Sequence, residues 1–483
     1  MKLSSMKTHS SSSTVVVAEA LEHMLQRPID PKTLRENFQS YFAELTRREI
    51  AEWPDSVATC ERGLEALQAS VSFGSDSYST DVMLAAFDAP DSEVIVVQVF
   101  GTSETVAIPN QREAIADWIE AGYVEPRVAE AAQYVADRHG VLNSHSLMVA
   151  MAAGAECAPT RDWVAADGHV AAIMRANESR WLELFASASK NSVIYVPIKK
   201  SLLVDGHVPQ SVEDIARVAG LDLVEDAGLV ASFVGQVFRS THYSTYLVAG
   251  FAYAPGAAHV VAQAVQDLVM HASMSRIPAK KLVLGWLGTP TDSLAMPLEV
   301  MEDRLTRYSL RSLPTRIRDR VFSLFGGLVA PDVEYAEWHH SKLSFINCSA
   351  NMQGPNYLFA KRSQRQRAYV AAHHGVGTAY VVVPASRSDS VLDYKIIEAT
   401  YSGAERCGVR PFEVVETQAL AAVVFAYLIE EPVGKDPLDP TAIHFAFASH
   451  GGLWRLPYRP SSIWAAATVM GWRTWLRQKL ARR

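Results

Sequence analysis

The stretch FINCSANMQGPNYLFAKRSQRQRAYVAAHHGVGTAYVVVP, residues 345–384, decides the fold that this sequence predicts. It reads in order as an apolar strand, Ser349, a helix, and a second apolar strand that ends at Pro384. The helix carries Tyr357 and Lys361, and residues four apart lie on the same face of a helix. The sequence therefore predicts an ammonium group beside a phenol.

This pairing has a chemical consequence. A free tyrosine has a pKa of about 10, which makes it a poor acid or base at neutral pH. A fixed cation beside it favours the phenolate and lowers the pKa of the phenol, so we expect Lys361 to tune Tyr357 for proton transfer. Tyr and Lys at this spacing also occur by chance, as a half-buried ring beside a solvated amine, so the flanking elements have to carry the argument.

A second informative stretch runs from Lys280 to Leu313. It begins with a short apolar run, Lys281–Leu284, that suits a buried strand. Gly285 and Gly288 allow a tight exit of the backbone from that strand. A polar loop and one long helix, on which Ser309 lies, complete the predicted unit.

The order of these elements resembles the C-terminal half of a short-chain dehydrogenase/reductase, and ketoacyl reductases are the nearest type. The resemblance covers about residues 280–431 and includes a late helix over Arg410–Glu431. It implies that Tyr357 protonates a substrate carbonyl as hydride arrives, that Lys361 also holds the nicotinamide ribose, and that Ser349 hydrogen-bonds the carbonyl oxygen.

The same resemblance assigns further residues by their place in the family pattern. Ser309 stands where the family has an asparagine of the proton relay. Gly288 matches the last glycine of an Asn-Asn-Ala-Gly motif, and Pro384 matches a Pro-Gly turn, which places both beside the cofactor. The chain departs from the pattern elsewhere, because Ser349 lies only eight residues before Tyr357, a shorter interval than is usual in the family.

The cofactor of this family is NADP or NAD, whose pyrophosphate lies on a glycine-rich turn after a strand. No Thr-Gly-x3-Gly-x-Gly run occurs in the chain. The nearest substitute is a β-branched strand, Glu93–Phe100, followed by a turn and a helix over Gln111–Glu120. We therefore predict that Gly101 and Ser103, in that turn, contact the cofactor.

Composition limits the class of protein. The net charge of −7 and pI of about 6.1 argue against a nucleic-acid-binding surface over the whole protein. No apolar run approaches the roughly 18 residues of a membrane span. The few cysteines are far apart and suit a reducing compartment, so we expect a cytoplasmic protein without a metal site; they are Cys60, Cys157, Cys348 and Cys407.

Strands alternate with helices from residue 91 to about 431, which predicts a doubly wound, mostly parallel α/β sheet. Phe233–Phe238 is expected to be one of its strands. The sheet forms either one unit or two Rossmann-like units in tandem. The predicted segments are a disordered tail (1–14), a helical segment (15–90), two α/β units (91–240 and 241–435) and a proline-rich loop with a terminal helix (436–483).

Two helices carry basic residues. The terminal helix has Trp464 and Trp472 near one face and arginines on the remainder, which suits either an anionic membrane or acidic partner, or packing on its own domain; we favour packing. The run KRSQRQR, Lys361–Arg367, suits either an acidic acyl-carrier partner near the site or a solvated helix face.

Two functions follow. The first is an NAD(P)H-dependent reductase that acts on a small-molecule or carrier-bound carbonyl, such as an acyl thioester, as a monomer or homo-oligomer. The second is a Rossmann-like scaffold or regulatory partner that has lost its cofactor site, which the missing glycine run favours.

Overall fold

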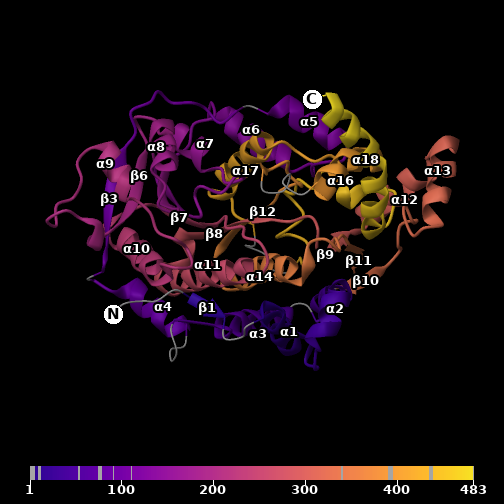
Figure 1. Ribbon diagram of the computed structural model, residues 1–483, viewed down its shortest axis with the longest axis horizontal. Helices are drawn as coiled ribbons and strands as arrows, with labels where there is room; N and C mark the ends of the chain where they lie inside the picture. The colour runs from indigo at the N-terminus through magenta and orange to yellow at the C-terminus, as the bar shows by residue number, and fades with distance from the viewer. Residues whose placement is uncertain are drawn as a thin grey trace.

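The computed structural model describes residues 6–8, 12–52, 55–73, 79–90, 92–109, 111–338, 341–389, 395–433 and 439–481. It confirms the predicted class, a mixed α/β fold built on a mostly parallel sheet (Figure 1). Side chains are described as far as residue 472, which leaves out those of the arginines expected on the terminal helix.

The main sheet has seven strands in the order β12-β8-β7-β4-β5-β6-β3. Six are parallel to one another, whereas β3 pairs antiparallel with β6 at the edge. The strands are β3 (Val94–Phe100), β4 (Ser146–Met151), β5 (His169–Ile173), β6 (Val193–Lys199), β7 (Thr245–Gly250), β8 (Leu282–Gly288) and β12 (Gly377–Val382).

Helices cover both faces of this sheet. The side chains of each strand alternate between the two faces and are therefore buried on both. Leu147 and Val149 of β4 belong to one apolar core, and Met148 and Ala150 belong to the other. On the first face lie α10 (Ala227–Ser240), α11 (Ala257–Arg276) and α14 (Gly354–His373). On the second face lie α5 (Arg112–Glu120), α6 (Val128–Asp137), α7 (Thr160–Ala165), α8 (Glu178–Ser187), α9 (Val212–Val218) and α17 (Val414–Leu428).

The N-terminal helices form a further layer outside α11 and α14 (Figure 1). They are α1 (Ser13–Leu25), α2 (Pro31–Ala51), α3 (Ser56–Ala69) and α4 (Ser79–Asp88). The tail expected to be disordered contains a short strand, β1 (Met6–Thr8), which pairs with β2 (Val71–Phe73). Residues 1–5 and 9–11 of that tail lie outside the described residues.

A small antiparallel sheet lies beside the main one, in the order β10-β11-β9. It consists of β9 (Ser293–Pro297), β10 (Tyr335–Trp338) and β11 (Ser341–Asn347). The apolar strand before Ser349 is therefore β11 and does not belong to the main sheet. The long helix expected after β8 is two helices, α12 (Leu298–Ser309) and α13 (Leu313–Ser323), because Pro314 starts the second.

Two sequence predictions need correction. The proposed boundary at 240–241 divides one continuous sheet, because β3 to β6 and β7, β8 and β12 pair within it, so the tandem alternative is wrong. The expected strand Phe233–Phe238 lies inside α10. Val230, Val234 and Val237 of that helix are buried at helical spacing, and this periodicity outweighs the strand propensity of the segment.

The terminal helix α18 (Ile463–Ala481) packs against α16 (Lys395–Ala404), as favoured from the sequence. Glycines allow the two backbones to touch. A Cβ on Gly403 would lie 1.9 Å from the carbonyl oxygen of Ala467, and one on Gly471 would lie 1.8 Å from that of Ala399. Within the described residues, no helix has the length and apolar character needed to cross a membrane.

Candidate functional site

Helix α14 connects the end of the small sheet to β12 and is covered on both sides, by the main sheet and by α1–α3. Its polar middle is therefore buried: Arg362, Gln364 and Arg367 have exposed fractions of 0%, 0% and 4%. Both sequence interpretations of the KRSQRQR run are wrong, since this segment offers neither a solvated face nor a basic surface for an acidic carrier.

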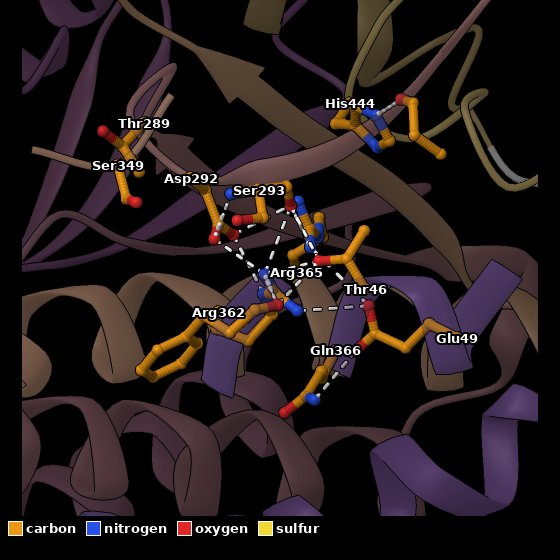
Figure 2. Close-up of polar contacts among 12 residues, drawn as sticks. Thr46, Glu49, Thr289, Asp292, Ser293, Ser349, Arg362, Arg365, Gln366 and His444 are labelled. Carbon is orange, nitrogen blue, oxygen red and sulfur yellow. Dashed lines mark hydrogen bonds and ion pairs between the residues drawn. The ribbon is translucent and has the colours of Figure 1, made fainter. Parts of the chain in front are cut away.

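Arg362 fixes α14 to the loop that follows β8 (Figure 2). Its Nε donates to Asp292 Oδ2 at 2.9 Å and its Nη2 to Asp292 Oδ1 at 2.7 Å. This is a bidentate pair, the strongest geometry for an arginine and a carboxylate. Nη2 also donates to Thr46 Oγ1 of α2 at 2.8 Å, so the same guanidinium contacts the N-terminal layer.

A second arginine and a second carboxylate complete a neutral quartet. Glu49 Oε2 lies 3.3 Å from Arg362 Nη1 and 3.7 Å from Arg365 Nη2, and Asp292 Oδ2 lies 3.2 Å from Arg365 Nη1. Burial alone would raise the pKa of Asp292, but the two guanidinium groups hold it below its usual value. Asp292 is therefore favoured as a carboxylate in the interior, where the guanidinium groups of Arg362 and Arg365 compensate its charge.

A third buried arginine joins α14 to α11. Arg367 donates from Nε and Nη2 to the two carboxylate oxygens of Asp267, at 2.7 and 2.8 Å. Gln68 of α3 donates to the same carboxylate at 2.7 Å. The N-terminal layer, α11 and α14 thus share one set of buried polar contacts.

The structure places Tyr357 and Lys361 at the carboxyl edge of the main sheet, half-buried above the end of β8. The Tyr357 hydroxyl donates to Thr289 Oγ1 at 3.2 Å. Thr289 Oγ1 lies 2.8 Å from Thr291 Oγ1, which accepts from Gln353 Nε2 at 2.5 Å. A chain of hydroxyl groups therefore runs from the phenol along the loop after β8.

The electrostatics of the pair differ from the prediction. Burial raises the pKa of Tyr357 to about 12, although the hydrogen bond to Thr289 acts the other way. Lys361 Nζ donates to the Leu287 carbonyl at 2.9 Å, and among the described residues no hydrogen bond joins it to the phenol. Burial lowers the pKa of Lys361 to about 8. The expectation of a lowered phenol pKa is therefore wrong: at neutral pH Tyr357 is a protonated donor beside a cation that titrates near pH 8.

His259, near the start of α11, adds a buried imidazole to the site. Its ring centroid lies 5.5 Å from that of Tyr357 and 5.3 Å from that of Tyr253. Neither ring nitrogen has a hydrogen bond of normal geometry among the described residues, although the ring is 1% exposed and the Ala252 backbone is near. Burial, and then the Lys361 cation, lower the pKa of His259 to about 3, so the ring is neutral at physiological pH.

The two predicted serines do not join this site. Ser349 follows β11, is fully buried, and donates its hydroxyl to Asn347 Oδ1 at 2.6 Å. Ser309 is exposed at the last residue of α12, where its hydroxyl donates to the Thr306 carbonyl at 2.8 Å. Thr289 has the place expected for Ser349, because β8 and not β11 is the strand of the main sheet that precedes the Tyr-x3-Lys helix.

The predicted cofactor residues fall at opposite edges of the sheet. Gly288 and Pro384 lie at the carboxyl ends of β8 and β12, next to Tyr357 and Lys361 along the edge. Gly101 and Ser103 follow β3, whose last residue pairs with the first residue of β6. Because β3 is antiparallel, this turn is at the amino edge, about 20 Å away along the strands.

The role assigned to Gly101 and Ser103 therefore needs correction. A Cβ on Gly101 would lie 2.0 Å from the Ser189 carbonyl oxygen, so glycine is required there for backbone packing. The Ser103 hydroxyl donates to the Ala186 carbonyl at 2.8 Å. Both residues close the sheet edge, and neither can reach a ligand bound beside Tyr357.

Sequence reasoning missed Thr289 and His259, and also Cys157, whose thiol is half-buried after β4 and has a pKa raised by burial. One signal was present in the sequence. Each of the three follows an apolar strand, and ligands of open α/β sheets bind at the carboxyl ends of the strands. Recognising β7 and β8 as parallel strands of the sheet would have selected the segments that follow them. His259 lies in the segment after β7, and Thr289 lies in the segment after β8.

Comparison of this chain with protein-family profiles, with curated proteins and with solved structures finds no match in any of the three.

The lowered pKa of Lys361 predicts a pH-dependent stability. Between about pH 8 and pH 10.5 the unfolded chain binds a proton at this amine that the folded chain has released, so the free energy of unfolding rises with pH across that window. Lys361→Met should remove this rise, and should therefore stabilise the protein more at pH 7 than at pH 10, as measured by urea unfolding.

Lys190→Met is the matched control, because it removes an exposed amine that pairs with Glu104. An equal pH dependence in wild type and Lys361→Met would show that the amine is not held as described.

Proposed function

We propose that the carboxyl edge of β4, β7, β8 and β12 is the active site of an NAD(P)H-dependent carbonyl reductase of the short-chain type. The observation that supports this most is the hydrogen bond between the Tyr357 hydroxyl and Thr289, with Lys361 one turn further along α14. A proton donor, a second hydroxyl and a cation are the groups that carbonyl reduction needs from a protein.

The strand order supports the proposal. Numbered along the chain, the parallel strands lie in the order third, second, first, fourth, fifth and sixth, from β6 to β12. This is the order of dinucleotide-binding sheets, which bind their ligand where the order reverses. Here that point lies between β4 and β7, and His259 follows β7 at that edge of the sheet.

The residues after β4 and β5 fit a dinucleotide in their chemistry. Ala152, directly after β4, has a φ of 63°, a strained conformation of the kind that collects at binding sites. Thr160, the first residue of α7, has a buried hydroxyl without a hydrogen-bond partner among the described residues. Arg175 follows β5 with an 81% exposed side chain, and an arginine there suits the 2′-phosphate of NADP. Of these residues, Arg175 is the one that favours NADPH over NADH.

The roles of the catalytic residues follow from their contacts. When bound, a nicotinamide dinucleotide would supply the hydride for carbonyl reduction. Tyr357, protonated at neutral pH, would give its proton to the carbonyl oxygen, and Thr289 would donate a hydrogen bond to the same oxygen. Lys361, a cation below about pH 8, would stabilise the phenolate that remains. The product would be an alcohol.

The substrate class is a small carbonyl compound. A carrier-bound thioester, which the resemblance to ketoacyl reductases suggested, has less support, because the arginines of the run Lys361–Arg367 are buried and offer no surface to an acidic carrier.

A cofactor-free scaffold is the second candidate function. It is favoured by the loop between β4 and α7, which has Gly154 as its sole glycine where dinucleotide-binding proteins have a glycine-rich turn. It is also favoured by α7 itself, whose six residues make a short helix. The two candidates differ in whether a dinucleotide binds.

Dinucleotide affinity tests the proposal against the scaffold. Titration of the full chain, followed by fluorescence, should give saturable binding that is at least about tenfold tighter for NADPH than for NADH. Arg175→Ala should weaken NADPH binding about tenfold and leave NADH binding unchanged, since a lost charged contact is worth about 1.4 kcal/mol.

Arg161→Ala removes an exposed arginine that pairs with Glu183 and serves as the control. Absence of saturable binding of either dinucleotide would reject the reductase and leave the scaffold.

Turnover measurements distinguish the hydroxyl of Thr289, which follows β8, from the hydroxyl of Ser349, which follows β11. With NADPH and a panel of aldehydes and ketones, Tyr357→Phe should reduce kcat about a hundredfold or more with little change in cofactor affinity. Thr289→Val, which has the same shape without the hydroxyl, should reduce kcat by a similar factor. Ser349→Ala should leave it near that of the wild type; a loss in Ser349→Ala with normal turnover in Thr289→Val would contradict the assignment.

A further inference from the structure

Four arginines of the described residues have side chains that are almost wholly buried. Three of them have carboxylate partners, and these are Arg362, Arg365 and Arg367. The fourth, Arg304 of α12, is 2% exposed, and no carboxylate oxygen of the described residues lies within 4.0 Å of it. Arg304 is therefore a buried cation without a direct carboxylate partner among the described residues, although the Asp332 carboxylate still favours its charged form.

The contacts of Arg304 satisfy part of its hydrogen bonding, and none of them is to a carboxylate of the described residues. Nε donates to the Leu456 carbonyl at 3.2 Å, and Nη2 donates to the Tyr458 carbonyl at 3.0 Å. Nη1 makes no hydrogen bond to the described residues. Burial lowers the pKa of Arg304, yet a guanidinium stays charged in proteins. Buried charges are normally paired, because an unpaired one is costly.

Arg304 also differs from the other three in lining an open cleft. This cleft has a volume of about 200 Å³, and its wall includes Asn347, Phe345 and Ser461. The side-chain oxygen Oδ1 of Asn347 accepts from the backbone N–H and the hydroxyl of Ser349. The side-chain nitrogen Nδ2 of Asn347 makes no hydrogen bond to the described residues. The cleft therefore offers a guanidinium nitrogen, an amide and a hydroxyl as donors, beside one aromatic ring.

The charges around the cleft sum to one positive charge. Arg47 pairs with Glu334 and Arg459 pairs with Asp332, so these rim residues cancel. Arg304 remains as the charge of the cleft wall without a paired counter-ion among the described residues.

We propose that this cleft binds a small oxyanion, a phosphate or carboxylate group, and that Arg304 Nη1 is its principal donor. The anion supplies the paired counter-charge that Arg304 lacks among the described residues, and Asn347 and Ser461 complete its hydrogen bonds. The cleft lies among α2, α12, β11 and residues 459–461, and none of the residues assigned to carbonyl reduction lines it, so the proposal is independent of that function.

The test is thermal unfolding of the full chain in sodium phosphate, in sodium succinate and in sodium chloride at equal ionic strength. A ligand that binds the folded state raises the unfolding temperature in proportion to the logarithm of its concentration above Kd. Phosphate or succinate should give such a logarithmic rise and chloride should not, and the anion whose rise begins at the lower concentration identifies the preferred group. Arg304→Met should abolish the rise, while Arg276→Met, which removes an exposed arginine paired with Asp88, should retain it.

Ser461→Glu provides a second variant that does not remove a buried charge. It places a carboxylate on the cleft wall, so it should raise the unfolding temperature without added anion and lose the response to phosphate and succinate. The proposal is overturned if neither anion raises the unfolding temperature of the wild type more than chloride does, or if Ser461→Glu responds as wild type does. The Ser461→Glu result decides the question even if Arg304→Met does not fold.

Discussion

The bidentate pair between Arg362 and Asp292 is the contact on which the candidate site depends. Asp292 belongs to the loop after β8, and Arg362 is the residue next to Lys361 on α14. The pair therefore sets how α14 lies over the end of the fifth parallel strand. Given that position, Tyr357 reaches Thr289 and Lys361 reaches the Leu287 carbonyl without further adjustment.

The pair is stable in the interior because its surroundings are neutral and hydrogen-bonded. A single buried charge costs several kcal/mol, whereas Arg362, Arg365, Asp292 and Glu49 compensate one another. Glu49 comes from α2, so the N-terminal helices are needed for charge balance at α14 and not merely as a cover. Polar contacts of this kind have narrow geometric requirements, and they select one docking of the N-terminal layer where an apolar interface would tolerate several.

The sequence predicted the alternation of strands and helices, and it predicted that Tyr357 and Lys361 lie on one helix that leads into an apolar strand, since apolar strands and an i,i+4 pair are local patterns. It did not predict which strand precedes their helix in the sheet. Leu343–Cys348 and Leu282–Gly288 are both apolar runs, and pairing over long distances in sequence decides that the first enters a separate antiparallel sheet. The buried arginines were taken for surface residues for the same reason. Their carboxylate partners Asp292, Asp267 and Glu49 are 70, 100 and 313 residues away in the chain, and no local pattern predicts such contacts. Gly101 was a reasonable candidate by its β-turn-α setting, and only the antiparallel direction of β3 excludes it.

A double-mutant cycle on Arg362→Met and Asp292→Leu, measured as free energies of unfolding, tests the central claim most directly. Each single substitution leaves a buried charge without its partner and should cost about 3 to 5 kcal/mol. The double substitution removes both charges and leaves Arg365 with Glu49, so it should be more stable than either single variant, with a coupling energy of about 3 kcal/mol. Costs that add to within about 0.5 kcal/mol would contradict the account, because they would mean that the two side chains do not act as a pair.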